Sequence, residues 1–305
     1  MIIRTLAAAA VLSLAATACS QQPDTAKAPA VQAAASLDVT PIRIGDLQAW
    51  ALKDGGMSLS AADSPWADKT AVGSVLQAAG AQTVDLSIQP LLVRDGDRVV
   101  LIDAGAGGGM GTEGKLVASL KAAGVQPEQV TDVLITHAHG DHVGGLARGG
   151  ALTFPNAVIR MSASEWTFAR EDELKNGAQA LLAAITPKVQ TFEPGAQITP
   201  AIRAVPLDGH TPGHTGYQIA SGGQMLLVIG DALHSSLVSV SRPDLANDWD
   251  SDKAAGAATR ADLLARAADG NLRLYAGHFP YPGVGRIARR GEGYVWVPEA
   301  ASAGR

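Results

Sequence analysis

Cysteine is almost absent from this 305-residue sequence, which contains a single one, Cys19. One cysteine cannot form an intramolecular disulfide, and Cys19 lies in a segment that we expect to be an export signal. No thiolate is then left to bind a metal inside the fold, so any metal site must use histidine, aspartate or glutamate. Basic residues are also scarce, because 24 Lys and Arg face 29 Asp and Glu. Without a basic surface for a phosphate backbone, we expect no nucleic-acid partner.

Two common catalytic motifs are missing as well. The chain has no Gly-x-Ser-x-Gly sequence, which excludes the nucleophilic serine of that strand-to-helix turn. The glycine-dense stretch from Gly105 to Gly111 lacks the Gly-Lys-Ser/Thr ending of a phosphate-binding loop. We therefore interpret it as a flexible loop.

The first residues have the pattern of a bacterial export signal. Arg4 supplies the positive start, 6–16 an apolar run too short to span a bilayer, and Ala18 a small residue before the cleavage point. Cys19 follows as in a lipoprotein signal, although Ala16 stands where leucine is usual. We predict a signal peptide at 1–19, a flexible tether at 20–36 and one folded domain at 37–305. The protein would be periplasmic, or anchored to the membrane by a lipid on Cys19.

Hydrophobic patterning predicts alternating strands and helices in the domain. We expect helices at 113–123, 162–185 and 252–268, and strands at 84–93, 98–102, 130–135, 156–161, 202–207, 217–220, 224–229, 272–276 and 286–297, the last a pair. Residues with metal-binding side chains recur where strands run into loops. This placement indicates a site at one edge of a sheet stack.

The run Thr136-His137-Ala138-His139-Gly140-Asp141-His142 is the strongest signal in the chain. On an α-helix, His137 and His139 would point about 200° apart, which excludes a shared helical face. At an extended strand end they point the same way, and a turn at Gly140 can bring Asp141 and His142 close. The other histidines are His210, His214, His234 and His278. A solvated histidine tract is the alternative, but it would lack the preceding buried strand.

This run resembles the His-x-His-x-Asp-His signature of the metallo-β-lactamase superfamily. The stretches 209–214, 228–231 and 276–278 are similar to the family's remaining metal motifs, and Asp103 matches an aspartate beneath the site. The resemblance covers roughly 80–300. It implies an α+β fold, the four-layer αββα sandwich.

The resemblance also implies a site with two zinc ions, which manganese, iron or cobalt could replace. His137, His139 and His210 would hold one metal, and Asp141, His142 and His278 the other, with Asp231 bridging. A hydroxide between the metals would attack the substrate. The implied catalytic residues are Asp141, which could orient the nucleophile, and Asp231. His234 is a further catalytic candidate from its position alone: three residues past Asp231, it could donate to an oxyanion or leaving group near the pocket mouth. A surface position is the alternative for His234.

Within the superfamily, the sequence most resembles the methyl parathion hydrolase group. The stretches that carry this likeness are 126–130, 154–158, 278–285 and 291–294. One departure is 232–235, which contains His234 where that group is apolar. His214 is either a pocket residue or a turn residue bonded to backbone. The aromatic residues that could form a substrate wall, or simply belong to the core, are Trp166, Phe168, Phe279 and Tyr281.

We therefore expect hydrolysis of a small ester-like molecule, namely a phosphotriester, an aryl ester or a lactone. A β-lactamase is an alternative, although Pro-Gly-His-Thr at 212–215 stands where one lactamase subclass has a serine that seats the substrate carboxylate. A nuclease is disfavoured by the net charge of −5. The alternative outside enzymes is a non-catalytic metal-binding lipoprotein.

Overall fold

Two β-sheets dominate the computed structural model, which describes residues 38–112 and 114–300. The first sheet is antiparallel through its first four strands and parallel through the rest, in the order β1 (Val39–Ile44), β2 (Leu47–Leu52), β5 (Leu91–Asp95), β6 (Arg98–Ile102), β7 (Asp132–Leu134), β10 (Val158–Ser162) and β11 (Val189–Phe192). The second sheet has the order β12 (Ile202–Pro206), β13 (Thr215–Ser221), β14 (Gln224–Val228), β15 (Leu274–Tyr275), β16 (Val284–Arg290) and β17 (Gly293–Pro298).

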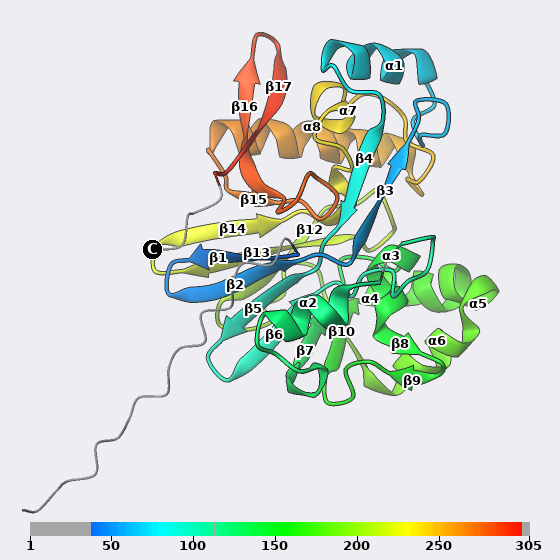
Figure 1. Cartoon of the computed structure of the whole chain (residues 1–305), viewed down its shortest axis with the longest axis vertical. Helices are drawn as coiled ribbons and strands as arrows, with labels where there is room; N and C mark the ends of the chain where they lie inside the picture. Colours follow the sequence, from blue (N-terminus) through cyan, green and yellow to red (C-terminus); the bar gives the residue numbers. More distant parts are fainter. Residues whose placement is uncertain (1–37, 113, 301–305) are drawn as a thin grey trace, which may run out of the picture. The chain divides into compact units, whose positions relative to one another are not determined.

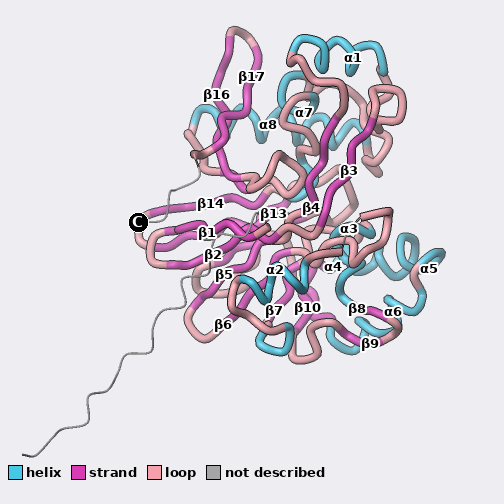
Figure 2. The backbone as a smooth tube through the Cα atoms, viewed as in Figure 1, coloured by secondary structure: helices cyan, strands magenta, loops and turns pink. Residues whose placement is uncertain are grey.

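Helices lie on the outer face of each sheet (Figures 1 and 2). The first sheet is covered by α2 (Leu116–Ala122), α4 (Ala163–Phe168), α5 (Leu174–Gly177) and α6 (Gln179–Ile185), and the second mainly by α8 (Lys253–Asp269). Two small hairpins add β3 (Gly55–Leu59) with β4 (Val84–Ile88), and β8 (Ala147–Arg148) with β9 (Ala151–Leu152). The remaining helices are α1 (Lys69–Ala78), α3 (Gly140–Val143) and α7 (Val238–Ser241).

Strand alternation explains this layering. On β6, Val100 and Ile102 join the core between the two sheets, whereas Leu101 joins the core under the helices. Successive side chains of a strand point to opposite faces, so an all-apolar strand must be covered on both. On the far side, Leu263 and Leu264 of α8 pack against the second sheet. The expected four-layer αββα arrangement is confirmed.

Two expected elements are divided in the structure. The predicted strand 84–93 is wrong as one unit, because β4 pairs with β3 while β5 belongs to the first sheet. The break falls at Gln89 and at Pro90, which has no N–H for a sheet ladder. The predicted helix 162–185 is interrupted by a π-helical turn, η3 (Ala169–Glu173), and again after α5. Its start is capped by Ser162, whose hydroxyl accepts from the Glu165 N–H.

The expected signal and tether, 1–36, lie outside the described residues. Among those that are described, no helix is long and apolar enough to cross a membrane.

Candidate metal centre

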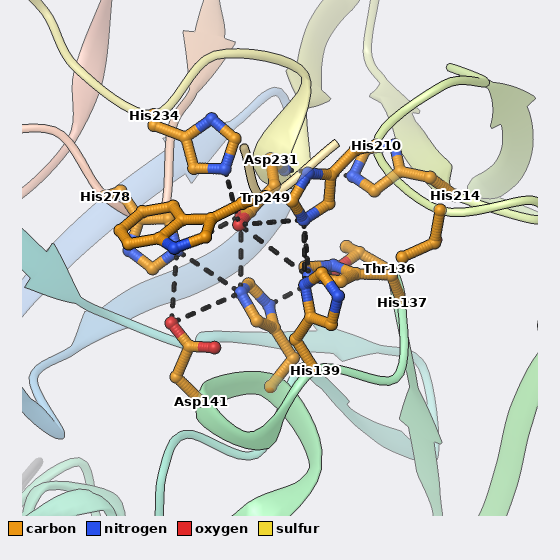
Figure 3. Close-up of polar contacts among 12 residues, drawn as sticks. Thr136, His137, His139, Asp141, His210, His214, Asp231, His234, Trp249 and His278 are labelled. Atoms are coloured by element: carbon orange, nitrogen blue, oxygen red, sulfur yellow. Dashed lines mark hydrogen bonds and ion pairs between the residues drawn. The ribbon is translucent and has the colours of Figure 1, made fainter. Parts of the chain in front are cut away.

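Loops at one edge of the two sheets bring the candidate ligands together (Figure 3). His137 and His139 follow β7, His210 lies between β12 and β13, Asp231 follows β14, and His278 follows β15. The Nε2 atom of His210 lies 3.2 Å from His137 Nε2 and 2.9 Å from His139 Nδ1. Side chains more than seventy residues apart in sequence are thus in direct contact.

Among the described residues, the possible ligand atoms form four overlapping sets of three. Two of these sets contain Asp231: it is joined by His137 and His142 in one, and by His210 and His234 in the other. The remaining two share no residue, and we call them the two groups. His137, His139 and His210 make one, and Asp141, His142 and His278 make the other, each with its ligand atoms within 4.8 Å of one another. In the second group, His142 Nε2 and His278 Nε2 are 3.3 Å apart. We call the two groups together with Asp231 the metal cluster. All seven predicted ligand residues lie in it, and their binding of metal stays a prediction.

Asp231 lies between the two groups and turns one oxygen toward each. Its Oδ2 atom is 3.4 Å from His210 Nε2 and 3.7 Å from His137 Nε2. Its Oδ1 atom is 3.1 Å from His278 Nε2 and 3.3 Å from His142 Nε2. A carboxylate placed in this way can bind two cations at once.

The donor set fits divalent cations such as zinc. Within the described part of the chain, the buried Oδ1 of Asp231 has no hydrogen-bond partner, which is costly for a charged oxygen. Imidazole nitrogens that face one another at about 3 Å satisfy each other poorly without a proton or a cation between them. Histidine with a few carboxylates is a typical zinc donor set.

Hydrogen bonds behind the cluster fix which nitrogen of His142, His278 and His210 faces inward. The Nδ1 atom of His142 is 2.9 Å from Asp103 Oδ2, and that of His278 is 2.7 Å from the Ser87 carbonyl oxygen. His210 Nδ1 lies 3.1 Å from Asp250 Oδ1. Carbonyl and ionised carboxylate oxygens only accept, so Nδ1 carries the proton and Nε2 offers its lone pair to the cluster.

Two of these three bonds go to aspartates, and of the two only Asp103 was predicted. Asp103 accepts from the Thr136 backbone N–H at 2.8 Å, and its left-handed φ of 61° is unusual for a residue other than glycine. Asp250 also accepts from Arg260 at 2.7 Å, and both residues are buried. Burial raises the pKa of Asp250, and Arg260 opposes that rise. Asp250 lies in no recognisable motif, so the sequence offered no signal for it.

The histidines of the two groups differ in the direction of their pKa shifts. Burial lowers the pKa of His137 and of His210 well below the usual value. Burial also acts to lower the pKa of His278, but the nearby charges of Asp231 and Asp141 outweigh it and raise that pKa to about 9. Negative potential is therefore concentrated at the Asp141 group.

His214 belongs to the scaffold behind the cluster. Its Nδ1 donates to the Leu207 carbonyl at 2.9 Å, and its Nε2 accepts from the Asp231 backbone N–H at 2.9 Å. Burial lowers the pKa of His214 to about 4, which keeps it neutral. The predicted bonding to backbone is confirmed, and the same bonds place His214 behind the cluster, where it holds the main chain of Asp231.

His234 differs from its prediction. It lies neither at the pocket mouth nor on the surface, because its side chain is fully buried with Nε2 3.2 Å from Asp231 Oδ2. The Asn247 side-chain oxygen accepts from the Trp249 N–H at 2.9 Å, which turns the Asn247 amide nitrogen toward His234 Nδ1 at 3.2 Å. His234 Nδ1 must then accept, and Nε2 carries the proton. This tautomer is the reverse of that in His142, His210 and His278.

A cavity of about 540 Å³ opens onto the cluster. We call its apolar side chains the apolar wall: Met57 and Leu86 from the β3–β4 hairpin, Met110 from the glycine-rich loop, and Trp249. The two acids Glu173 and Asp248 also line it, while no lysine or arginine among the described residues does. The glycine-rich loop does lie beside the site, as expected.

The aromatic wall suggested by the sequence is wrong, since none of its four residues lines this cavity. Phe279 is fully buried and packs against Trp296, with ring centroids 4.9 Å apart. Tyr281 packs on the core between the sheets and donates to the Ala51 carbonyl. Trp166 and Phe168 pack on the core under the helices.

Comparisons with known proteins agree with this geometry. The profile of the metallo-beta-lactamase superfamily matches residues 85–291, and the chain belongs to that superfamily. The solved structure of AidC, a dizinc quorum-quenching lactonase in complex with a product, matches with a TM-score of 0.80 and 28% identity, covering 86% of this chain and 97% of AidC. The solved structure of the hydrolase AbOPH of the β-lactamase superfamily matches with a TM-score of 0.78 and 31% identity. This match covers 86% of this chain and 97% of AbOPH.

A curated relative, the N-acyl homoserine lactonase of Bacillus thuringiensis, is 28% identical over 122 residues, which is 39% of this chain and 46% of the lactonase. The chain thus spans about half the length of that relative. These matches confirm the predicted superfamily. They do not confirm the narrower likeness to methyl parathion hydrolases, because lactonases are the more prominent relatives.

Proposed function

We propose that this protein is a hydrolase that uses two divalent cations, preferably zinc, to cleave a neutral ester or lactone with an apolar substituent. The observation that carries the proposal is the position of Asp231, whose two oxygens face two separate groups of ligand atoms. The dizinc lactonase AidC, which shares 28% identity with this chain, supports the same number of metals.

The roles of the ligands follow from the two groups. His137, His139 and His210 would hold one cation, Asp141, His142 and His278 the other, and Asp231 both. Bound there, the cations would lower the pKa of a water toward neutrality and polarise the scissile carbonyl or phosphoryl oxygen.

The chain's own residues would orient the reacting groups. The Asp141 carboxylate lines the cavity, so it is placed to accept a proton from the nucleophile. His234 lies behind the cluster, and its Nε2 is 3.2 Å from Asp231 Oδ2, a contact without the geometry of a hydrogen bond. We therefore assign His234 to holding the Asp231 carboxylate. A direct contact with the leaving group would require the side chain to reach the cavity, and it is fully buried.

The charge of the cavity favours a neutral substrate. Glu173 would repel an incoming carboxylate, whereas the charge of Asp248 is paired with Lys253 at 2.6 Å. The described residues place no cationic side chain in the lining to seat a carboxylate. This disfavours a β-lactamase, whose substrates carry a carboxylate. A neutral lactone or ester would enter, and the acid formed by hydrolysis would be repelled on leaving. The apolar wall would contact the rest of the substrate.

Metal analysis combined with a substrate panel tests the proposal. We expect two equivalents of zinc per chain, with turnover of para-nitrophenyl acetate and of an N-acyl homoserine lactone, weaker turnover of a dimethyl aryl phosphotriester, and none of nitrocefin. Only trace metal after metal saturation would refute the proposal. Nitrocefin as the only substrate would favour a β-lactamase, and two metals without any turnover would favour a metal-binding lipoprotein.

We also propose export to the periplasm, with or without a lipid anchor on Cys19. The support is the signal pattern at 1–19. The mass of the mature N-terminus decides between the two forms, because an acylated Cys19 is heavier than a plainly cleaved chain. An uncleaved N-terminus in cells would contradict both.

A further inference from the structure

Glu165 connects the two chain segments that supply the three-histidine group. Its Oε1 accepts from the Ala138 backbone N–H at 2.7 Å, and Ala138 lies between His137 and His139. Its Oε2 accepts from the Thr211 hydroxyl at 2.7 Å and from the Gly213 backbone N–H at 3.0 Å, just after His210. Glu165 is fully buried and does not line the cavity.

The start of α4 is fitted closely to the His210 loop. The Ser162 hydroxyl accepts from the Glu165 N–H at 3.1 Å and donates to the Gly213 carbonyl at 2.8 Å. A Cβ on Gly213 would lie only 2.2 Å from the Glu165 nitrogen, so glycine is required for this approach. The carboxylate is therefore held at a fixed place between the two segments.

Burying this carboxylate is unfavourable for the fold alone. Burial raises the pKa of Glu165 to about 7, even though its three hydrogen bonds favour the charged form. Every one of those bonds goes to a segment that carries a candidate ligand of the three-histidine group. An unfavourable buried charge placed in this way indicates a positioning task.

We propose that Glu165 is a positioning residue that fixes the distance between the His137–His139 segment and the His210 loop, and so prepares the three-histidine group for a cation. The inference rests on the proposed binding of metal. The two groups of the metal cluster should then depend on Glu165 unequally, because its three hydrogen bonds reach only the segments around His137, His139 and His210.

Glu165→Gln tests this, because it keeps the shape and replaces one acceptor oxygen with an amide donor. Either Ala138 or the Thr211 and Gly213 pair then faces a donor. In dialysis against increasing chelator, we expect the variant to release its first metal equivalent at a chelator activity about tenfold lower than wild type, with the second little changed. In metal-free protein, the Ala138 amide should exchange hydrogen faster.

Asp132→Asn is the matched control. Asp132 is also a buried carboxylate and lies on β7, the strand that leads into the histidine run, but it bonds Arg98 and Arg160. We expect this variant to lose thermal stability and to keep the wild-type chelator titration. If Glu165→Gln gives the same titration as Asp132→Asn, Glu165 is a structural residue only and the inference is overturned.

If Glu165→Gln does not fold, Thr211→Val tests the same positioning role of Glu165. It removes one hydrogen bond and keeps the carboxylate, so the first metal should again leave early, by a smaller factor. Unchanged metal release in Thr211→Val would then overturn the inference. Wild-type protein that binds no metal would instead refute the proposed function, and the two failures are distinguishable.

Discussion

The metal cluster at the bottom of the cavity is buried and hydrogen-bonded, whereas two of the four side chains of the apolar wall, Met110 and Trp249, are exposed. His137, His210 and His278 are at most 3% exposed, and each has a hydrogen-bond partner on the nitrogen that faces away from the cluster. Met110 is 60% exposed and Trp249 is 38% exposed. The metal cluster can therefore hold atoms at fixed distances, and the exposed side chains of the apolar wall can adapt to the substrate.

This contrast separates reactivity from selectivity. Hydrogen-bonded, buried ligands give the preorganised geometry that a reaction requires, and a small displacement there is costly. Apolar contacts in the wall are non-directional and change in small steps with area. Substitutions in the metal cluster should thus reduce turnover of all substrates. Substitutions in the apolar wall should change only which substrates are preferred.

Asp231→Asn should have the largest effect. Burial raises the pKa of Asp231, but the charges of His278, His142 and His137 outweigh it and hold the pKa well below the usual value, so the wild-type carboxylate is charged at neutral pH. The variant removes that charge and turns an amide donor toward the histidines. We expect kcat to fall more than about a hundredfold, beyond the loss typical of residues behind a metal. The far-ultraviolet circular dichroism should stay native, and full activity in a folded variant would refute the bridging role.

His234 should have the next largest effect, and its two variants test the assigned tautomer. His234→Phe removes the ring nitrogen that lies 3.2 Å from Asp231 Oδ2, so kcat should fall about tenfold to a hundredfold with KM and metal content unchanged. His234→Gln can still donate an N–H and should recover part of the loss. Loss of a metal equivalent from His234→Phe would show instead that His234 is a ligand.

The sequence predicted the residues of the metal cluster far better than the residues that surround them. The run 136–142 is local, so its spacing alone excluded a helical face and placed its ligands at a strand end. Asp250 and Glu165 act from 40 and 27 residues away along the chain, and no local pattern marks such contacts. The sequence indicated His234 as a catalytic candidate but did not predict its burial. That burial depends on contacts with Asn247 and Trp249, which hydrophobic periodicity does not reveal.

The fold shows the same limit. The strands β5, β6 and β14 and the helix α8 follow from local hydrophobicity, turns and caps. The break between β4 and β5 does not, because the Gln89 amide is fixed by the Ala276 and Phe279 carbonyls about 190 residues away. The wall was missed for a related reason: Leu86 alternates along β4 like any half-buried strand residue, and only the packed structure shows which face meets the cavity.

Trp249→Ala should affect the apolar wall most, although the indole also packs on His234, with ring centroids 5.4 Å apart. Removing the indole takes away apolar contact worth about 1 to 2 kcal/mol, so KM for a long-chain lactone should rise about tenfold. KM for para-nitrophenyl acetate, which has no chain to contact the wall, should stay the same. Val297→Ala is the control, because Val297 is 46% exposed and lies outside the cavity. An equal rise in KM for both substrates would show that Trp249 supports the metal cluster and does not select the substrate.

Glu173→Gln should give the smallest effect, a change in charge selectivity. Burial, followed by the charges of Asp172 and Asp141, raises the pKa of Glu173, so its negative charge develops at a higher pH than that of an ordinary glutamate. Wild-type discrimination against an aryl ester with a free carboxylate should therefore grow as the pH rises through that raised pKa. The variant should lose this rise, and kcat/KM for the anionic ester should increase about two- to threefold at low salt.

The control for this last variant separates a local charge from net charge. Glu171 is exposed and does not line the cavity, so Glu171→Gln removes the same charge from a different place. Because screening acts over about 10 Å at 0.1 M salt, the gain in Glu173→Gln should shrink as salt is added, and Glu171→Gln should show little gain at any salt. If both variants gain equally, the acidic lining selects nothing, and selectivity rests on the apolar wall alone.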